Sequence, residues 1–357
     1  MERSLKKLIY FDNHTVTKPC KESITAYTNS LTHNWGILGG HNQLSFDLEI
    51  QYQKAVTVIK NAFNSDDQWE LALNSSYHAL IQNMLIGLYS DVVCQSGKNH
   101  ILTTKHQNAL HLFSPLSEQL FLHQLDVEDI IKKIGPRTAL VSIPFACITG
   151  VLTPVEIIAR KCLENGSLLH IDMSLAVGKS ILDVQSLNAD LITFDGSLFS
   201  APIGTVGLLY KKMTLPSLNF KRCEFSNAAA NALAAALKIS QEQCDLTMME
   251  TARLSAKLSD GICSKLADVQ PLFLRNDRLP NTCCLAFPNI HNELLLFALN
   301  RQNLLASIPH PSLFNNHPLA KNIVIFALSR DTTDEDIDEA IDRIVFVKNQ
   351  YKQLWVE

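Results

Sequence analysis

Six apolar runs of strand length follow one another between residues 100 and 210, and segments with helical periodicity separate them. The runs are HILTT at 100–104, LFLHQL at 120–125, ALVSIP at 139–144, SLLHID at 167–172, LITF at 191–194 and VGLLY at 206–210. Strands this apolar are usually covered on both faces, as in a mostly parallel sheet flanked by helices. The pattern therefore predicts an α/β domain.

Cap residues predict where two of the helices begin. Thr153 and Glu156 have the spacing of a capping box around Pro154, and Gly166 would end the helix that follows. Thr332 and Glu335 have the same spacing before an amphipathic segment near the end of the chain. An alanine-rich helix is expected from about residue 226, and its small side chains offer a surface for close packing.

The last third of the chain has a different pattern. Short strands are expected at 283–287 and 322–328, and helices lie around them. Strands and helices grouped in this way are typical of a smaller α+β domain. We expect a large domain over residues 17–255 and a small domain built from 1–16 and 256–357.

Composition excludes several classes of function. The net charge of −4 and the lack of dense Lys/Arg runs argue against nucleic-acid binding. No apolar run reaches the roughly 18 residues of a membrane span, and the first residues lack the apolar stretch of a signal peptide. The nine cysteines are scattered and none forms a C-x-x-C pair, so we expect no metal site and a reduced, cytoplasmic protein.

Seven segments, in this order, resemble the cysteine desulfurases, which are class V members of the fold type I pyridoxal-phosphate enzymes. The segments are YFDNHTVTKP, ILTTKHQNAL, LVSIPFACITGVLTP, HIDMSLAVGK, ADLITFDGSLFSAPIGTVGLLY, LPNTCCLAF and IFALSRDTTDEDIDEAI, and they extend from residue 10 to about 345. The resemblance implies an α/β fold with a mainly parallel seven-stranded sheet and a smaller C-terminal domain. It also implies a dimer with sites at the subunit interface.

The same resemblance points to a set of vestigial cofactor-binding residues. Asp172 matches the aspartate that pairs with the pyridine nitrogen, which lets the ring act as an electron sink. His106 matches the histidine that stacks on the ring, and His78 stands at the threonine that binds the phosphate. Ser197, in the turn after Asp195, completes the set.

The residues that should react are different from the family pattern. Leu198 stands at the position of the Schiff-base lysine, and a leucine cannot form an imine. Ser312 lies near the position of the catalytic cysteine, Asp195 replaces a phosphate-binding hydroxyl, and Ile325 replaces the arginine that binds the substrate carboxylate. Lys179 matches a separate family lysine that is not placed to substitute.

These differences predict a non-catalytic pseudoenzyme that binds no cofactor and acts as a dimeric scaffold or partner subunit. It would pair with itself or with an active paralogue. Two alternatives stay open. One is an enzyme of the same family with changed chemistry. The other is a small-anion-binding protein that uses His78, His106 and the turn after Asp195.

Overall fold

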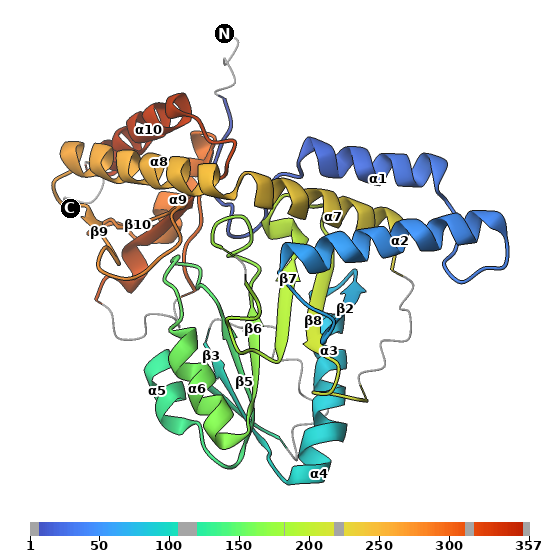
Figure 1. Cartoon of the computed structure of the whole chain (residues 1–357). Coiled ribbons are helices and arrows are strands. Elements are labelled where there is room, and N and C mark those ends of the chain that lie inside the picture. The colour runs from blue at the N-terminus through green and yellow to red at the C-terminus, as the bar shows by residue number, and fades with distance from the viewer. Residues whose placement is uncertain (1–6, 106–119, 182, 218–224, 311–317, 353–357) are drawn as a thin grey trace. The chain divides into compact units, whose positions relative to one another are not determined.

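The computed structural model describes residues 7–105, 120–181, 183–217, 225–310 and 318–352 (Figure 1). The chain forms two compact units. One comprises Lys18–Phe145 and Thr153–Gln243, and the other comprises Met1–Thr17, Ala146–Leu152 and Cys244–Glu357. The boundary expected at 255/256 lies inside helix α8 (Cys244–Lys265), whereas the compact units divide between Gln243 and Cys244, at the start of that helix.

The larger unit is built on a seven-stranded sheet. Its strands, in spatial order, are β2 (Trp69–Asn74), β8 (Val206–Lys211), β7 (Leu191–Asp195), β6 (Leu168–Asp172), β5 (Thr138–Pro144), β3 (His100–Thr104) and β4 (Phe121–Leu125). All neighbours from β7 to β4 are parallel, and β8 runs antiparallel to both β7 and β2. The predicted α/β class with a mainly parallel sheet is confirmed.

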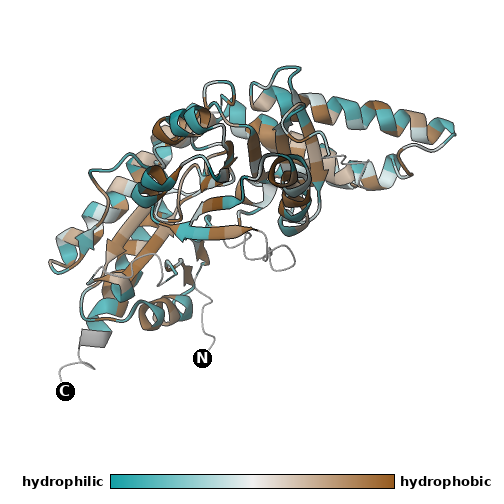
Figure 2. Cartoon of the chain, turned by 90° about the horizontal axis from the view of Figure 1, so that it is seen from below, coloured by the Kyte–Doolittle hydropathy of each residue, from teal (hydrophilic) through white to brown (hydrophobic). Residues whose placement is uncertain are grey.

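Helices cover both faces of this sheet, so the strands are apolar on both sides, and their hydrophobic residues are coloured brown in Figure 2. Val141, Ile171 and Phe194 belong to the core cluster on one face, together with residues of α2, α5, α6 and α7. Leu140 and Leu191 belong to the cluster on the other face, which is packed against α3. The helices of this unit are α1 (Lys21–His33), α2 (Gln43–Ala62), α3 (Tyr77–Leu88), α4 (Cys94–Ser96), α5 (Val127–Lys133), α6 (Val155–Asn165) and α7 (Asn227–Glu242).

Helix α6 begins differently from the prediction. Gly166 ends it in the left-handed conformation (φ 59°), as expected. Thr153, however, is not its N-cap, because its hydroxyl donates to the carbonyl of Pro144 at 2.5 Å. The residue in the cap position is Pro154, which makes no side-chain cap bond. The threonine hydroxyl thus ties the start of this helix to the end of β5.

The alanine-rich helix α7 is buried by the chain's own helices. Ser226 caps its first turn, and Ala230, Ala232 and Ala236 are completely buried. Helices α1 and α2 both pack along α7, and Figure 1 shows the three side by side. The small side chains allow these helices to approach closely. The alanine surface of α7 is therefore covered by other helices of the same chain.

The described residues of the smaller unit form short strands and the α-helices α8, α9 (Asn292–Arg301) and α10 (Asp334–Lys352). The antiparallel sheet has the order β12 (Ile323–Ala327), β10 (Thr282–Ala286) and β9 (Gln270–Pro271), and β1 (Ile9–Tyr10) pairs in parallel with β11 (Leu304–Leu305). Helices α8, α9 and α10 complete the unit.

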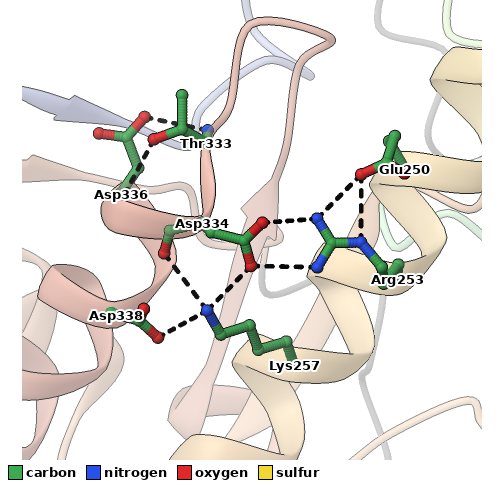
Figure 3. Close-up of polar contacts among 7 residues, drawn as sticks. All are labelled: Glu250, Arg253, Lys257, Thr333, Asp334, Asp336 and Asp338. Atoms are coloured by element: carbon green, nitrogen blue, oxygen red, sulfur yellow. Dashed lines mark hydrogen bonds and ion pairs between the residues drawn. The ribbon is translucent and has the colours of Figure 1, made fainter.

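Ion pairs connect α8 to the start of α10 (Figure 3). Arg253 contacts Asp334 at 2.7 Å, and Lys257 contacts Asp334 at 2.9 Å. These cations hold the pKa of Asp334 well below its usual range. The predicted cap is shifted by one residue: Thr333, not Thr332, forms a reciprocal capping box with Asp336.

Candidate functional site

Polar side chains gather on one face of the large sheet, at the carboxyl ends of its central strands. Side chains alternate between the faces of a strand, so residues two apart share a face. On the α3 face, β5, β6 and β7 change from leucine to polar residues along their length. The leucines are Leu140, Leu168 and Leu191, and the polar residues that follow them are Ser142, His170, Asp172, Thr193 and Asp195. Buried polar groups cost free energy unless they are hydrogen-bonded, so this cluster requires partners.

The partners form a continuous chain of hydrogen bonds. Ser142 Oγ lies 2.7 Å from His170 Nδ1, and His170 Nε2 lies 2.9 Å from Thr193 Oγ1. Thr193 Oγ1 lies 3.2 Å from the hydroxyl of Tyr77, at the start of α3. The Tyr77 hydroxyl donates to Asp172 Oδ2 at 2.9 Å. The network thus joins three strands and one helix, and it ends at a carboxylate.

The direction of these bonds follows from the charge states. Burial lowers the pKa of His170 to about 3, so its ring is neutral and has one donor and one acceptor nitrogen. Burial and the nearby Asp172 carboxylate raise the pKa of Tyr77 well above its usual range, so the phenol keeps its proton. Because Tyr77 donates to Asp172, its oxygen accepts from Thr193. His170 Nε2 then donates to Thr193, and Nδ1 accepts from Ser142.

Asp172 is the last residue of β6, and its two oxygens have different partners. Burial raises the pKa of its carboxyl group. Oδ1 accepts hydrogen bonds from the Ser174 amide at 2.9 Å and the Ser174 hydroxyl at 2.5 Å. The Ser174 hydroxyl also accepts from the Asp195 amide at 2.9 Å. Asp172 is therefore coupled to the turn that follows β7.

That turn is held by its own residues. The Asp195 carboxylate accepts from the Ser197 amide at 2.9 Å and the Ser197 hydroxyl at 2.7 Å, which caps a single 3₁₀ turn over Gly196–Leu198. A Cβ on Gly196 would lie 2.8 Å from the carbonyl oxygen of Thr205, so only glycine fits where the turn approaches β8. Asp195 and Ser197 thus satisfy each other inside the turn.

Lys179 lies beneath this turn. Its amine donates to the carbonyl of Leu198 at 3.1 Å, and the side chain is buried. Burial disfavours the charged ammonium and lowers the pKa of Lys179 to about 8. The side chain of Leu198 itself is half-buried and carries no reactive group. The structure thus brings a buried amine to the backbone of residue 198.

The residues singled out from the sequence are only partly brought together. Asp172 and Ser197 lie in this site, and His78 is exposed in the first turn of α3, next to Tyr77. His106 and Ser312 fall outside the described residues. Sequence reasoning missed four members of the network: Ser142, His170, Thr193 and Tyr77. The signal for three of them was a polar residue at every second position inside apolar strands.

Two negative observations concern the described part of the chain. In residues 7–105, 120–181, 183–217, 225–310 and 318–352, no three His, Cys, Asp or Glu side chains gather as metal ligands would. Within the same ranges, no helix has the length and apolar character needed to cross a membrane.

Comparisons with known proteins agree with the fold. Residues 9–226 match the family model described as aminotransferase class-V. A cysteine desulfurase of Trichormus azollae is 25% identical over 94% of this chain and 91% of its own length. The cysteine desulfurase NifS of Azotobacter vinelandii is 27% identical with the same coverage. Among solved structures, a NifS-like protein has a TM-score of 0.87 at 20% identity, covering 96% of this chain and all of its own.

The family corrects one expectation from the sequence. We expected no cofactor because the lysine that holds it is missing. That expectation is wrong: class V aminotransferases, including the cysteine desulfurases that this chain matches over most of its length, depend on pyridoxal phosphate. The expected replacement of the lysine by Leu198 concerns how a cofactor is attached, which is a different question from whether it binds.

Proposed function

The chain belongs to the class V aminotransferase family, is cysteine desulfurase-like, and on that premise we propose that it binds pyridoxal phosphate without a covalent bond. We propose further that it releases no sulfide from cysteine and serves as a dimeric partner subunit. The observation that carries this proposal is Leu198, a half-buried leucine at the end of the short turn after β7, where the family resemblance expects the lysine.

The ring end of the cofactor fits the residues present. Asp172 is a half-buried carboxylate at the carboxyl edge of the parallel part of the sheet, which is where ligands of open α/β sheets bind. It would accept a hydrogen bond from the protonated ring nitrogen, and the bound cofactor would supply an electron sink. The amide groups in the first turn of α3, beside Ser76, offer donors for a phosphate group.

The residues at the expected positions for cofactor attachment and for substrate binding do not fit a desulfurase. The side chain of Leu198 offers no amine for covalent attachment or for moving a proton. Ile325 is completely buried in β12 among Cys284, Ala286 and Ile323, so it cannot pair with a carboxylate. The Asp195 carboxylate accepts the hydrogen bonds of the Ser197 amide and hydroxyl, so this pair offers no donor to an anion. Binding without turnover is the function that this combination supports.

A second candidate is an enzyme with changed chemistry, and Lys179 is the observation that favours it. A buried amine with a pKa of about 8 is partly neutral near physiological pH, as a nucleophilic lysine must be. Its nitrogen lies 3.1 Å from the Leu198 carbonyl. A covalent adduct between Lys179 and the cofactor would support this alternative over the non-catalytic proposal.

The proposal is tested by incubating the purified protein with pyridoxal phosphate and cysteine. We expect sulfide to stay at the level of a protein-free control, while equilibrium dialysis detects bound cofactor that gel filtration removes. The NifS desulfurase of Azotobacter vinelandii serves as the positive control. Cysteine-dependent sulfide production by this chain, free of contaminating desulfurase, would refute the non-catalytic proposal.

Self-association is expected from exposed apolar residues on the α1–α2 hairpin. Ile24 and Leu31 are seven residues apart on α1, and Phe46 and Ile50 are four apart on α2, so each pair shares a helix face. Trp35, between the helices, is 67% exposed. Large apolar side chains gathered on one segment are typical of an interface.

Light scattering at micromolar concentration should therefore give twice the chain mass of 39.8 kDa. Trp35→Glu should shift the mass towards the monomer. Leu163→Glu, at a still more exposed apolar position on α6, should leave the dimer unchanged. A monomer for the unmodified protein would contradict the homodimer and make a heterodimer with an active paralogue the partner to test.

A further inference from the structure

The hydroxyl of Tyr77 is hydrogen-bonded to Oδ2 of Asp172. This is the carboxylate oxygen that the ring nitrogen of a bound cofactor would need as its acceptor. Ser174 donates twice to Oδ1, from its amide and its hydroxyl. Oδ2 accepts from the Tyr77 hydroxyl at 2.9 Å. A protonated ring nitrogen donates a hydrogen bond of the same kind to a carboxylate oxygen. Tyrosine and ring nitrogen would therefore compete for the same atom.

We propose that Tyr77 is an internal competitor for the cofactor ring, and that a pyridine ring reaches Asp172 only when the Tyr77 hydroxyl leaves it. The inference rests on the proposed role of Asp172 as the partner of the ring nitrogen. It assigns to this chain a positioning residue that sets how tightly the cofactor is held.

Tyr77 lies at the edge of the α3 core cluster, with part of its side chain exposed. It is the first residue of α3, directly after the Ser76 cap, and it is only half-buried, with its ring packed at the margin of the α3 core cluster. Rotation of this side chain towards solvent is the movement that the proposal requires. When the hydroxyl leaves, Thr193 keeps its bond to His170 and Asp172 keeps its two bonds to Ser174.

The contact that must break is a strong one. It joins a hydroxyl to a half-buried carboxylate, and hydrogen bonds to charged groups contribute more than neutral ones. Burial, and after it the proximity of the Asp172 carboxylate, raises the pKa of the phenol. The cofactor must replace this bond before it gains its own, so the affinity of the unmodified protein is reduced. Removing the hydroxyl alone should therefore increase the affinity for the cofactor by at least a factor of about ten.

The experiment compares the dissociation constant of pyridoxal phosphate for four proteins: unmodified, Tyr77→Phe, Tyr77→Ala and Tyr89→Phe. Tyr77→Phe keeps the ring and removes only the hydroxyl, and it should bind at least tenfold tighter. Tyr89→Phe removes a phenol hydroxyl from the same core cluster, at the end of α3, and should bind like the unmodified protein. Urea unfolding of each variant checks that it folds.

A second readout follows Tyr77 itself. With tyrosines labelled at the phenol carbon, nuclear magnetic resonance reports the pH at which each ring ionises. Without cofactor the Tyr77 signal, identified by its loss in Tyr77→Phe, should resist ionisation at the pH where free tyrosine titrates, near 10. With cofactor bound it should ionise closer to that pH, because the hydroxyl has left the half-buried carboxylate.

The outcomes separate the inference from the proposed function. If the unmodified protein and Tyr77→Phe both fail to bind the cofactor, the proposed function fails. If both bind with equal affinity, or if only Tyr77→Ala binds more tightly, competition by the hydroxyl is refuted and the proposed function stands. Tighter binding by Tyr77→Phe together with a shifted Tyr77 ionisation supports the inference.

Discussion

Leu198→Lys should convert reversible cofactor binding into covalent attachment. Borohydride reduction followed by unfolding should leave the unmodified chain at its own mass, while most of the variant gains the mass of one reduced pyridoxal phosphate at residue 198. The physical reason is that the variant supplies a primary amine in the turn after β7, where the resemblance places the family's lysine. Intact mass spectrometry and peptide mapping measure the result.

Sulfide release should nevertheless stay at background in Leu198→Lys. Ile325 still leaves a substrate carboxylate without a cationic partner, and catalytic groups act as a unit, so restoring one regains little. Leu198→Arg is the matched control, because it adds a positive charge without a nucleophilic amine and should gain no mass. An adduct at Lys179 in the unmodified protein would contradict non-covalent binding and support the changed-chemistry alternative.

Acidification should destabilise the protein through His170. The native pKa of this buried imidazole is about 3, whereas an unfolded histidine has a pKa near 6.5. As the pH falls below about 6.5, the unfolded chain takes up a proton that the native state refuses, so stability is lost progressively down to about pH 3. Between pH 7 and pH 4.5 this single group should cost roughly 2.5 kcal/mol.

The comparison variant for this effect is His170→Gln, which keeps a polar side chain but cannot titrate. Urea unfolding of both proteins at a series of pH values gives the difference between their free energies of unfolding. From pH 7 to pH 4.5, the unmodified protein should lose that amount of unfolding free energy relative to the variant. Above pH 7 the difference between the two proteins should be constant. A difference that does not depend on pH would mean that His170 has the same pKa in the native and unfolded states.

Much of the architecture was predictable because apolar burial leaves a direct trace in sequence. The runs 100–104 and 206–210 coincide with strands β3 and β8, with one more residue in β8, since strands covered on both faces must be apolar throughout. Strand β2, at the sheet edge, was not predicted. Its sequence WELALN mixes polar and apolar residues, and its pairing partner β8 is more than a hundred residues away.

Cap positions and the site were harder to predict, because hydroxyl groups have several competing partners. Thr153 has the spacing of a cap, yet its hydroxyl bonds to Pro144, and that contact exists only after β5 is in place. Asp172 was identified from the sequence, but its bond to Tyr77 joins residues 95 positions apart and has no local signature. Long-range polar contacts of this kind depend on the fold that produces them.

The burial of α7 by helices from the start of the chain sets an order on folding. The Ser23 hydroxyl donates to the carbonyl of Ala232, across 209 positions of sequence. During synthesis, α1 and α2 therefore leave the ribosome long before the alanine surface that they will cover. Their apolar faces stay open through that interval, and contacts between such distant residues form slowly. The nascent chain should accordingly need protection from aggregation until α7 has been made.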